Sequence, residues 1–204
     1  MPADTDRGYE VLSRSELPLG TVELARNLIG KRVVRVTSEG VLSGRIVETE
    51  AYPVGDAAGH AYRGETARNR ALFLEPGHAY VYLAYGVAYM LNVSSEAEGV
   101  GAGVLIRALE PLEGVAQMQR NRGVQSLRDL ARGPGRLAAA LDVDRRLDGS
   151  DLCRRGPLWI ARDVRDAPEI GVSTRIGLSR EAERLLRFYA RDNPFVSGPK
   201  ALNR

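Results

Sequence analysis

The 204-residue sequence has little of several residue types that carry chemistry in other proteins. It contains a single cysteine, Cys153, and two histidines, His60 and His78. One cysteine excludes an internal disulfide and fits a reducing compartment. One cysteine and two histidines are also too few to build a structural zinc site. We therefore expect no metal and no other cofactor, and we expect a cytoplasmic protein.

Long apolar runs are also absent. No stretch of 18 apolar residues occurs, which excludes a membrane-spanning helix. The first eight residues are polar and include acids, so we expect neither a secretory nor a transit peptide. The net charge of +3 and the pI near 9.2 permit an anionic partner such as a nucleic acid without requiring one.

Lysine is nearly missing, and arginine supplies almost all of the positive charge. Only Lys31 and Lys200 are lysines. This bias has two explanations: a GC-rich genome, or the two-pronged binding of phosphate groups by guanidinium. The bias alone does not decide between them.

The hydrophobic fraction of 44% is enough for a core at this length. We expect one mixed α/β (α+β) domain over residues 1–204, with a curved, largely antiparallel sheet, flanking helices and a protruding β-hairpin. Residues 1–18 are predicted to form a loosely ordered arm. The predicted helices are 19–30 (with Thr21 as N-cap), 113–120, 126–131 and 135–141. The predicted strands are 32–37, 44–52, 80–85, 89–94, 104–109, 158–161, 172–178 and 186–190.

Two carboxylates and a tyrosine stand on one predicted strand. Alternation along 45–52 (RIVETEAY) places four side chains on one face: Ile46, Glu48, Glu50 and Tyr52. The ordinary role of such an acid is to pair with a buried cation, and we favour it for Glu48. A strand-end carboxylate beside aromatic rings can also be a general base, because burial tunes its pKa. Arg107 interrupts the apolar strand 104–109 and must find a carboxylate, a phosphate or a water.

The loop around His60 offers an accessible imidazole and several arginines. A lone loop histidine is more often structural or solvated, but small neighbours leave this ring open. The following run, RGETARNR, contains Arg63, Thr66 and Arg68. Such a run is normally a solvated loop, yet these side chains would equally suit phosphate oxygens.

The predicted hairpin is rich in tyrosine. Tyr80 and Tyr82 share one face, whereas Tyr85 has the opposite parity and stands at the tip beside Gly86. A turn centred on residue 87 would place Tyr82 across from Asn92. A tyrosine-rich strand commonly covers a core. An exposed tip tyrosine near arginines is also typical of base stacking in nucleic-acid binding.

Seven sequence blocks occur in the order found in one protein family. They are 45–52 (RIVETEAY), 60–69 (HAYRGETARN), 76–86 (PGHAYVYLAYG), 91–95 (LNVSS), 104–113 (VLIRALEPLE), 133–141 (GPGRLAAAL) and 187–196 (RFYARDNPFV). This arrangement resembles the alkyladenine DNA glycosylases, which are the 3-methyladenine DNA glycosylases of the mammalian type. The similarity extends over nearly everything from Leu19 onward.

The resemblance implies roles for individual residues. It implies that Glu50 activates the attacking water and that Arg107 helps to hold that water. Tyr52, His60 and Tyr82 resemble the walls of the base pocket. The implied roles at the pocket edge are these: Tyr80 fixes the tautomer of His60, Tyr85 fills the hole left by the flipped nucleotide, and Asn92 screens out guanine. The implied contacts to the DNA backbone are Thr66, Ile176 and Gly177.

The resemblance further implies a monomeric, monofunctional enzyme that acts on double-stranded DNA containing damaged purines and associates with the nucleoid. Two departures leave the path of the His60 loop open. Gly59 precedes His60 where many bacterial members have serine, and Ala67 follows Thr66 where proline is usual. Two alternatives remain. A bifunctional glycosylase/lyase would need an amine from Lys31, Lys200 or Pro2, and a non-catalytic module would use the tyrosine hairpin alone.

Overall fold

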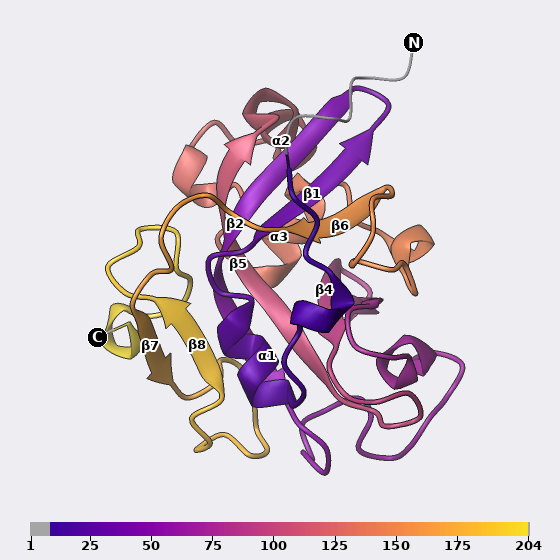
Figure 1. Ribbon diagram of the computed structural model, residues 1–204. Helices are drawn as coiled ribbons and strands as arrows, with labels where there is room; N and C mark the ends of the chain where they lie inside the picture. Colours follow the sequence, from indigo (N-terminus) through magenta and orange to yellow (C-terminus); the bar gives the residue numbers. More distant parts are fainter. Residues whose placement is uncertain (1–8, 204) are drawn as a thin grey trace.

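A computed structural model describes residues 9–203 (Figure 1). The strands are β1 (Arg32–Thr37), β2 (Gly40–Tyr52), β3 (Ala79–Ala84), β4 (Ala88–Ser94), β5 (Gly103–Glu113), β6 (Leu158–Ala161), β7 (Ile170–Ser173) and β8 (Arg187–Ala190). The α-helices are α1 (Thr21–Asn27), α2 (Val115–Arg122) and α3 (Pro134–Ala140). Short 3-10 helices are η1 (Arg14–Glu16), η2 (Arg70–Phe73), η3 (Leu127–Asp129), η4 (Arg145–Leu147) and η5 (Lys200–Leu202).

The strands form one curled sheet in which every pairing is antiparallel, which confirms the predicted α+β class. The main path runs β3-β4-β5-β2-β1-β6. Strand β8 joins the end of β2 at Glu48–Glu50, and β7 pairs with β8 (Figure 1). Strand β2 is therefore shared by both parts of the sheet, and its last residues lie at the junction.

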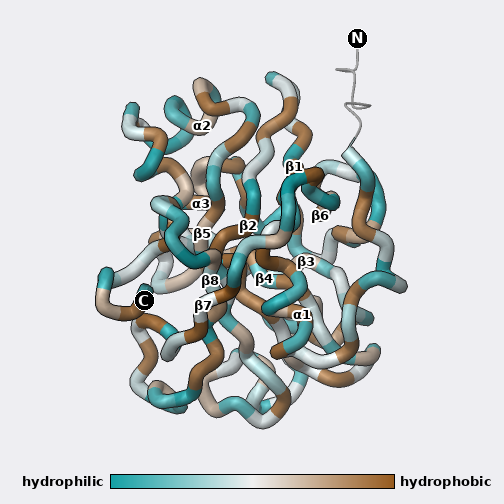
Figure 2. The backbone as a smooth tube through the Cα atoms, turned by 60° about the vertical axis from the view of Figure 1, so that its left-hand side comes forward, coloured by the Kyte–Doolittle hydropathy of each residue, from teal (hydrophilic) through white to brown (hydrophobic). Residues whose placement is uncertain are grey.

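The main core lies between this sheet and the three α-helices. It contains the apolar residues of β2 and β5 together with side chains such as Leu24 of α1 and Leu137 of α3. Figure 2 shows the apolar segments of the central strands toward the middle of the molecule. A second, smaller cluster around Trp159 covers part of the opposite face. Burial on both faces explains why the first half of β5 reads as a nearly continuous apolar run.

The prediction of a loosely ordered arm over residues 1–18 is wrong for residues 9–18; residues 1–8 lie outside the described part of the chain. Val11 bridges Ala161 at the edge of β6, and the Leu12 amide donates to the Ile160 carbonyl at 2.9 Å. Leu12 and Leu17 are buried. The segment is ordered because it extends the sheet and covers the cluster around Trp159.

Helix α1 begins later than predicted, and Thr21 is not its N-cap. Gly20 holds that position, and Thr21 is the first helical residue. The Thr21 hydroxyl and amide both donate to Oε1 of Glu96, at 2.6 and 2.9 Å. A carboxylate from a distant segment thus satisfies the helix N-terminus, which sequence spacing cannot indicate.

Several other boundaries differ from prediction. Strand β5 continues to Glu113, so α2 starts only at Val115, and the predicted helix over 126–131 is a single 3-10 turn. The predicted strand over 172–178 is wrong: β7 ends at Ser173, and residues 174–178 form a loop. The reason lies at Arg175, whose side chain turns inward to a buried carboxylate.

Strand β2 is irregular near its centre. Its register with β5 shifts between Ile46 and Glu48, so Ile46 packs in the main core together with its neighbour Val47.

The hairpin of β3 and β4 is present, but its register differs by one step from the prediction. Ala84 pairs with Ala88, so the turn centres on Gly86. Asn92 consequently lies opposite Tyr80, and Tyr82 lies opposite Met90. Tyr85 and Gly86 have φ of 50° and 71°, so two successive left-handed residues close the short loop.

None of the helices in the described range has the length and hydropathy needed to cross a bilayer.

Candidate active site

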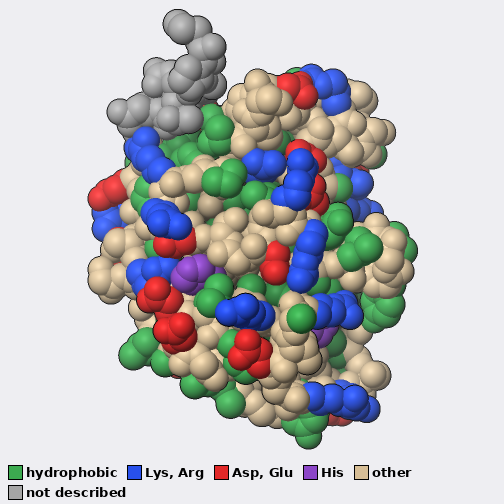
Figure 3. All heavy atoms as spheres, turned by 90° about the vertical axis from the view of Figure 1, so that its right-hand side faces the viewer, with side chains coloured by type: hydrophobic (Ala, Val, Ile, Leu, Met, Phe, Trp, Pro, Cys, Tyr) green, Lys and Arg blue, Asp and Glu red, His purple; other side chains and the backbone are tan. Residues whose placement is uncertain are grey.

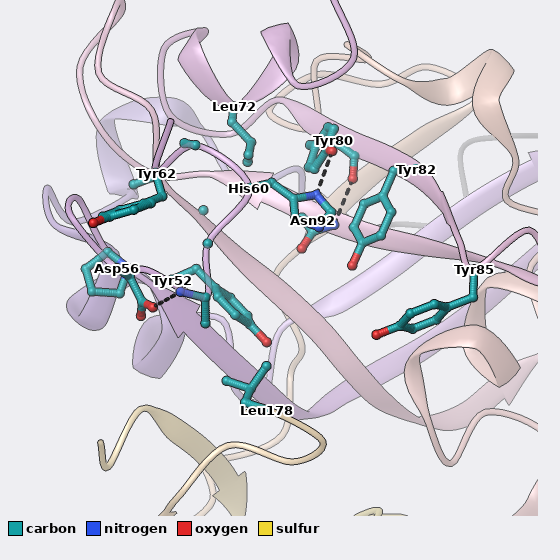
Figure 4. A pocket seen from close by; sticks show the side chains of 16 residues that line it. Tyr52, Asp56, His60, Tyr62, Leu72, Tyr80, Tyr82, Tyr85, Asn92 and Leu178 are labelled. Atoms are coloured by element: carbon teal, nitrogen blue, oxygen red, sulfur yellow. Dashed lines mark hydrogen bonds between the residues drawn. The ribbon is translucent and has the colours of Figure 1, made fainter. Parts of the chain in front are cut away.

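A cavity of about 180 Å³ opens between β2, the β3–β4 hairpin and the loop around His60. Six residues predicted for the site line it: Tyr52, His60, Tyr80, Tyr82, Tyr85 and Asn92. Figure 4 shows His60, Tyr80, Tyr82 and Asn92 gathered on one side, with Tyr52 and Leu178 on the other. The space between them is bounded by flat aromatic faces.

The first wall is an aromatic cluster from β3 and the His60 loop. The rings of Tyr80 and Tyr82 stack with centroids 5.3 Å apart, and His60 lies 4.3 Å from Tyr82. Nδ1 of His60 and the Tyr80 hydroxyl share a hydrogen bond of 2.9 Å. Asn92 is held beside them, since its Nδ2 donates to the Tyr80 carbonyl at 3.1 Å.

Protonation in this wall is set by burial and by Arg68. Burial raises the pKa of Tyr80 to about 12, so its hydroxyl keeps its proton at neutral pH. Desolvation, and then the charge of Arg68, lower the pKa of His60. Both effects favour a neutral imidazole, and the bond to Tyr80 restricts the orientation of that ring.

Glu50 is fully buried and accepts hydrogen bonds from three directions. Oε1 accepts from the Ile176 amide at 2.8 Å and pairs with Nη1 of Arg107 at 3.2 Å. Oε2 accepts from the Tyr52 hydroxyl at 2.9 Å. Burial, and then the charge of Glu50, raise the pKa of Tyr52, so this hydroxyl remains a donor. The orientation of the carboxylate is therefore fixed.

Glu50 and Arg107 are not among the described residues that line the cavity. They contact it through Tyr52, whose ring lines the space and whose hydroxyl reaches Glu50. The carboxylate thus lies behind one aromatic wall rather than on the open floor. A molecule in the cavity would reach Glu50 past the Tyr52 hydroxyl.

Arg107 connects the two predicted carboxylates. Its Nε lies 3.1 Å from Oε1 of Glu48, while its Nη1 binds Glu50. Burial lowers the pKa of Arg107, but Glu50 and Glu48 outweigh burial and raise it overall. The prediction that Arg107 must be paired is confirmed, and so is the ion-pair role of Glu48.

Sequence reasoning missed the second partner of Glu48. Arg187 is fully buried, and its Nε lies 2.7 Å from Oε1 of Glu48. Glu48 also accepts from the Ser197 amide at 2.7 Å and from its hydroxyl at 3.0 Å. Arg187 opens the recognised block 187–196, but an arginine at the start of a short strand ordinarily indicates a solvated edge.

Arg175 and Asp56 were also missed, and they lie directly against the site. Both are buried, with Nη1 and Oδ2 2.6 Å apart. Nη1 of Arg175 also donates to the Ala51 carbonyl at 3.0 Å, and the guanidinium carbon lies 4.6 Å from the centre of the Tyr52 ring. No local pattern indicates this pair, because the partners are 119 residues apart.

The arginine-containing loop is exposed at Arg63, Thr66 and Arg68. Its path is fixed by Asn69, whose Nδ2 donates to the carbonyls of His60 and Gly64 at 2.9 and 3.0 Å. The Asn69 Oδ1 accepts from the Thr66 amide and hydroxyl. The loop is thus braced although Gly59 and Ala67 depart from the family pattern.

The remaining predicted positions lie at the rim. Tyr85 is 99% exposed at the hairpin tip. Gly177 is exposed in the loop after β7, whereas the amide of its neighbour Ile176 is already engaged by Glu50. The face drawn in Figure 3 carries acidic and basic side chains side by side. Over residues 9–203, no group of three or more histidine, cysteine, aspartate or glutamate side chains could hold a metal ion.

The site has flat rings on two sides, a buried acid behind one of them and an exposed tyrosine at the rim. A protein with such a site can enclose a planar aromatic group beside a carboxylate. Comparison with known proteins agrees with this class. The methylpurine-DNA glycosylase family matches residues 16–194, and the chain belongs to this family.

Relatives support the same assignment. A protein of Mesorhizobium japonicum is 70% identical over 191 residues, covering 94% of this chain and 92% of its own. A protein of Paraburkholderia phytofirmans is 56% identical, with 94% and 90% covered, and one of Chlorobaculum parvum is 48% identical, with 87% and 86% covered. Each carries the name "Putative 3-methyladenine DNA glycosylase".

Proposed function

We propose that this protein is a monofunctional DNA glycosylase that turns a damaged purine out of the duplex and hydrolyses its N-glycosidic bond. The substrates belong to the class of 3-methyladenine, 7-methylguanine, hypoxanthine and ethenoadenine, and the product is an abasic site. The observation that carries the proposal is the buried, triply bonded Glu50 behind the Tyr52 wall of an aromatic cavity. Family membership and the names of the relatives support it.

The proposed chemistry needs one carboxylate. As the bond to the base lengthens, positive charge develops on the sugar, and a water attacks C1′ from the opposite face. Glu50 accepts the water's proton and stabilises the developing charge. Oε2 accepts one hydrogen bond, from Tyr52, and its second lone pair remains for the water. A ring-alkylated purine is already cationic and leaves without strong acid assistance.

The aromatic rings provide recognition in this proposal. The flipped purine stacks between Tyr52 on one side and Tyr82 with His60 on the other. Stacking contributes about 1–3 kcal/mol per base. Asn92, which lines the cavity, disfavours the exocyclic amino group of guanine.

Tyr85 and the exposed loops serve the DNA itself. The target atom is unreachable inside the stack, so the nucleotide must be extruded. The exposed ring of Tyr85 fills the gap and offsets part of the unstacking cost. Arg63, Thr66 and Arg68, with the loop at Gly177, contact the sugar-phosphate backbone. We also propose that the protein acts as a cytoplasmic monomer.

A release assay tests the proposal against its two alternatives. Duplex oligonucleotides carrying each lesion are incubated with the protein, and free base, strand breaks and borohydride-trapped adducts are measured. We expect free base, an intact abasic strand and no adduct. An adduct would indicate the lyase alternative with Lys31, Lys200 or Pro2 as nucleophile, and binding without base release would indicate the non-catalytic module.

A further inference from the structure

The ion pair of Arg175 and Asp56 places a buried cation against one wall of the cavity. The guanidinium carbon lies 4.6 Å from the centre of the Tyr52 ring. Tyr52 and Asp56 line the cavity, whereas Arg175 does not. The guanidinium therefore covers the side of the ring that faces away from the cavity.

Arg175 is held in this position by several bonds. Nη1 binds Oδ2 of Asp56 at 2.6 Å and the Ala51 carbonyl at 3.0 Å, and Nη2 donates to the Glu181 carbonyl at 3.3 Å. Arg184 lies 3.5 Å from the same oxygen of Asp56. Arg184 also lies 3.6 Å from Oε2 of Glu181, so two guanidinium groups and two carboxylates form one cluster, in which Asp56 is the acid paired with Arg175.

A cation on one face of an aromatic ring affects what binds to the other face. The electron-rich rings of Tyr52, Tyr80 and Tyr82 attract positively charged partners. A guanidinium behind Tyr52 already occupies its negative quadrupole and repels a second cation across the ring. A neutral flat base suffers no such repulsion. The same aromatic cavity therefore prefers cationic bases less strongly than its tyrosines alone would dictate.

We propose that Arg175 and Asp56 form a specificity-determining pair that sets the preference between cationic and neutral purines, with Asp56 controlling how much positive charge acts through Tyr52. This inference rests on the proposed function. It predicts that removing the charge of Asp56 slows the excision of cationic lesions relative to neutral ones. Removing the charges of both Asp56 and Arg175 should have the opposite effect.

The variants are chosen to change charge with little change of shape. Asp56→Asn keeps the Oδ1 acceptor that binds the Ala58 amide at 2.8 Å but removes the negative charge. Asp56→Asn/Arg175→Gln removes both charges and leaves an amide pair. Arg175→Lys keeps the positive charge but loses the planar guanidinium, which donates from both Nη1 and Nη2. The control is Asp163→Asn, which weakens an ion pair with Arg32 away from the cavity.

The measurement is the ratio of single-turnover excision rates for 7-methylguanine, which is cationic, and hypoxanthine, which is neutral, at slightly acid pH and saturating enzyme. We expect Asp56→Asn to lower the ratio about three- to tenfold and the double variant to raise it by a similar factor, the range of a partly desolvated cation–π contact. Arg175→Lys should slow both lesions and keep the ratio within about twofold of the wild-type value, as should the control.

Loss of folded protein lowers both rates and leaves their ratio unchanged, so it does not imitate the effect. If Asp56→Asn does not fold, because it leaves the buried Arg175 without its acid, the double variant carries the test, and an unchanged or lowered ratio in it would overturn the inference. An unchanged ratio in Asp56→Asn, or an increase, would overturn the inference while base release by the wild type upholds the proposed function. If the wild type releases neither base, the proposed function itself has failed.

Discussion

The backbone amide of Ile176 donates a hydrogen bond of 2.8 Å to Oε1 of Glu50, across 126 residues of sequence. This bond makes the loop after β7 a structural part of the site. Together with Arg107 and the Tyr52 hydroxyl, it leaves the carboxylate little rotational freedom. An uncharged residue of the same shape can keep the bond to Ile176, so charge and shape at position 50 can be tested separately.

Tyr85→Ala should weaken excision from duplex DNA much more than excision from single strands. In the proposed function, the exposed ring replaces the stacking that the flipped base has lost, and a single strand has no gap to fill. Without the ring, the extrahelical population and the apparent affinity fall together. The measurement compares single-turnover rates on the two forms of one oligonucleotide. Val164→Ala, a substitution at another exposed apolar residue, is the control. Equal losses on both substrates would mean that Tyr85 has only a structural role.

Asn92→Ser should relax selectivity against guanine-type bases. Asn92 lies opposite Tyr80 and lines the cavity, and its Nδ2 is held by the Tyr80 carbonyl. Serine is shorter and leaves room for the amino group of guanine. The rate ratio of 7-methylguanine to hypoxanthine should rise, with some loss on both bases because a polar group is left unpaired. An unchanged ratio would mean that Asn92 takes no part in selecting the base.

Glu48→Gln should destabilise the fold. Glu48 is fully buried and neutralises Arg187, which is itself fully buried. Removing one partner of a buried ion pair typically costs about 3–5 kcal/mol. Denaturant unfolding should show a loss of this size in the free energy of unfolding. Glu39→Gln breaks an exposed pair with Arg120 and should cost less than about 1 kcal/mol. Similar losses for the two variants would contradict the importance of the buried network.

His60 should titrate below its ordinary value near 6.5, because desolvation and the charge of Arg68 lower its pKa. The unfolded chain then binds the proton more readily than the folded protein. The His60 contribution to stability is therefore complete above about pH 6.5 and is lost as the pH falls toward the folded pKa. NMR titration can follow it directly, since the chain has two histidines. Arg68→Gln should raise the pKa of His60, whereas Arg128→Gln should not. A His60 pKa at or above 6.5 in the wild type would contradict the assignment.

The sequence allowed the sheet, the hairpin and most of the cavity to be predicted, because these depend on local alternation and on a family pattern. Strands β1 and β6 begin and end where alternation places them. The hairpin register could not be predicted, since it depends on two successive left-handed residues at Tyr85 and Gly86.

The long-range partners of the buried arginines could not be predicted from local sequence patterns either. Arg187 and Arg175 each find a carboxylate more than 100 residues away. The sequence around Arg187 predicts a solvated strand edge, and the sequence around Arg175 predicts a continuing strand. Only the folded chain shows that both arginines are buried. The order of residues 9–18 likewise depends on a distant strand edge at β6.

The most direct test of the account is Glu50→Gln. Glutamine can still accept the Ile176 amide bond and fill the same space, but it cannot take a proton from water at neutral pH. Loss of a general base typically costs about 10²–10⁴-fold in rate. We expect the single-turnover excision rates of hypoxanthine and 7-methylguanine to fall by at least about 100-fold, while the affinity for the lesion stays within a few-fold of the wild-type value. Glu39→Gln is the control and should leave both rates unchanged. Base release by Glu50→Gln at nearly the wild-type rate would contradict the account.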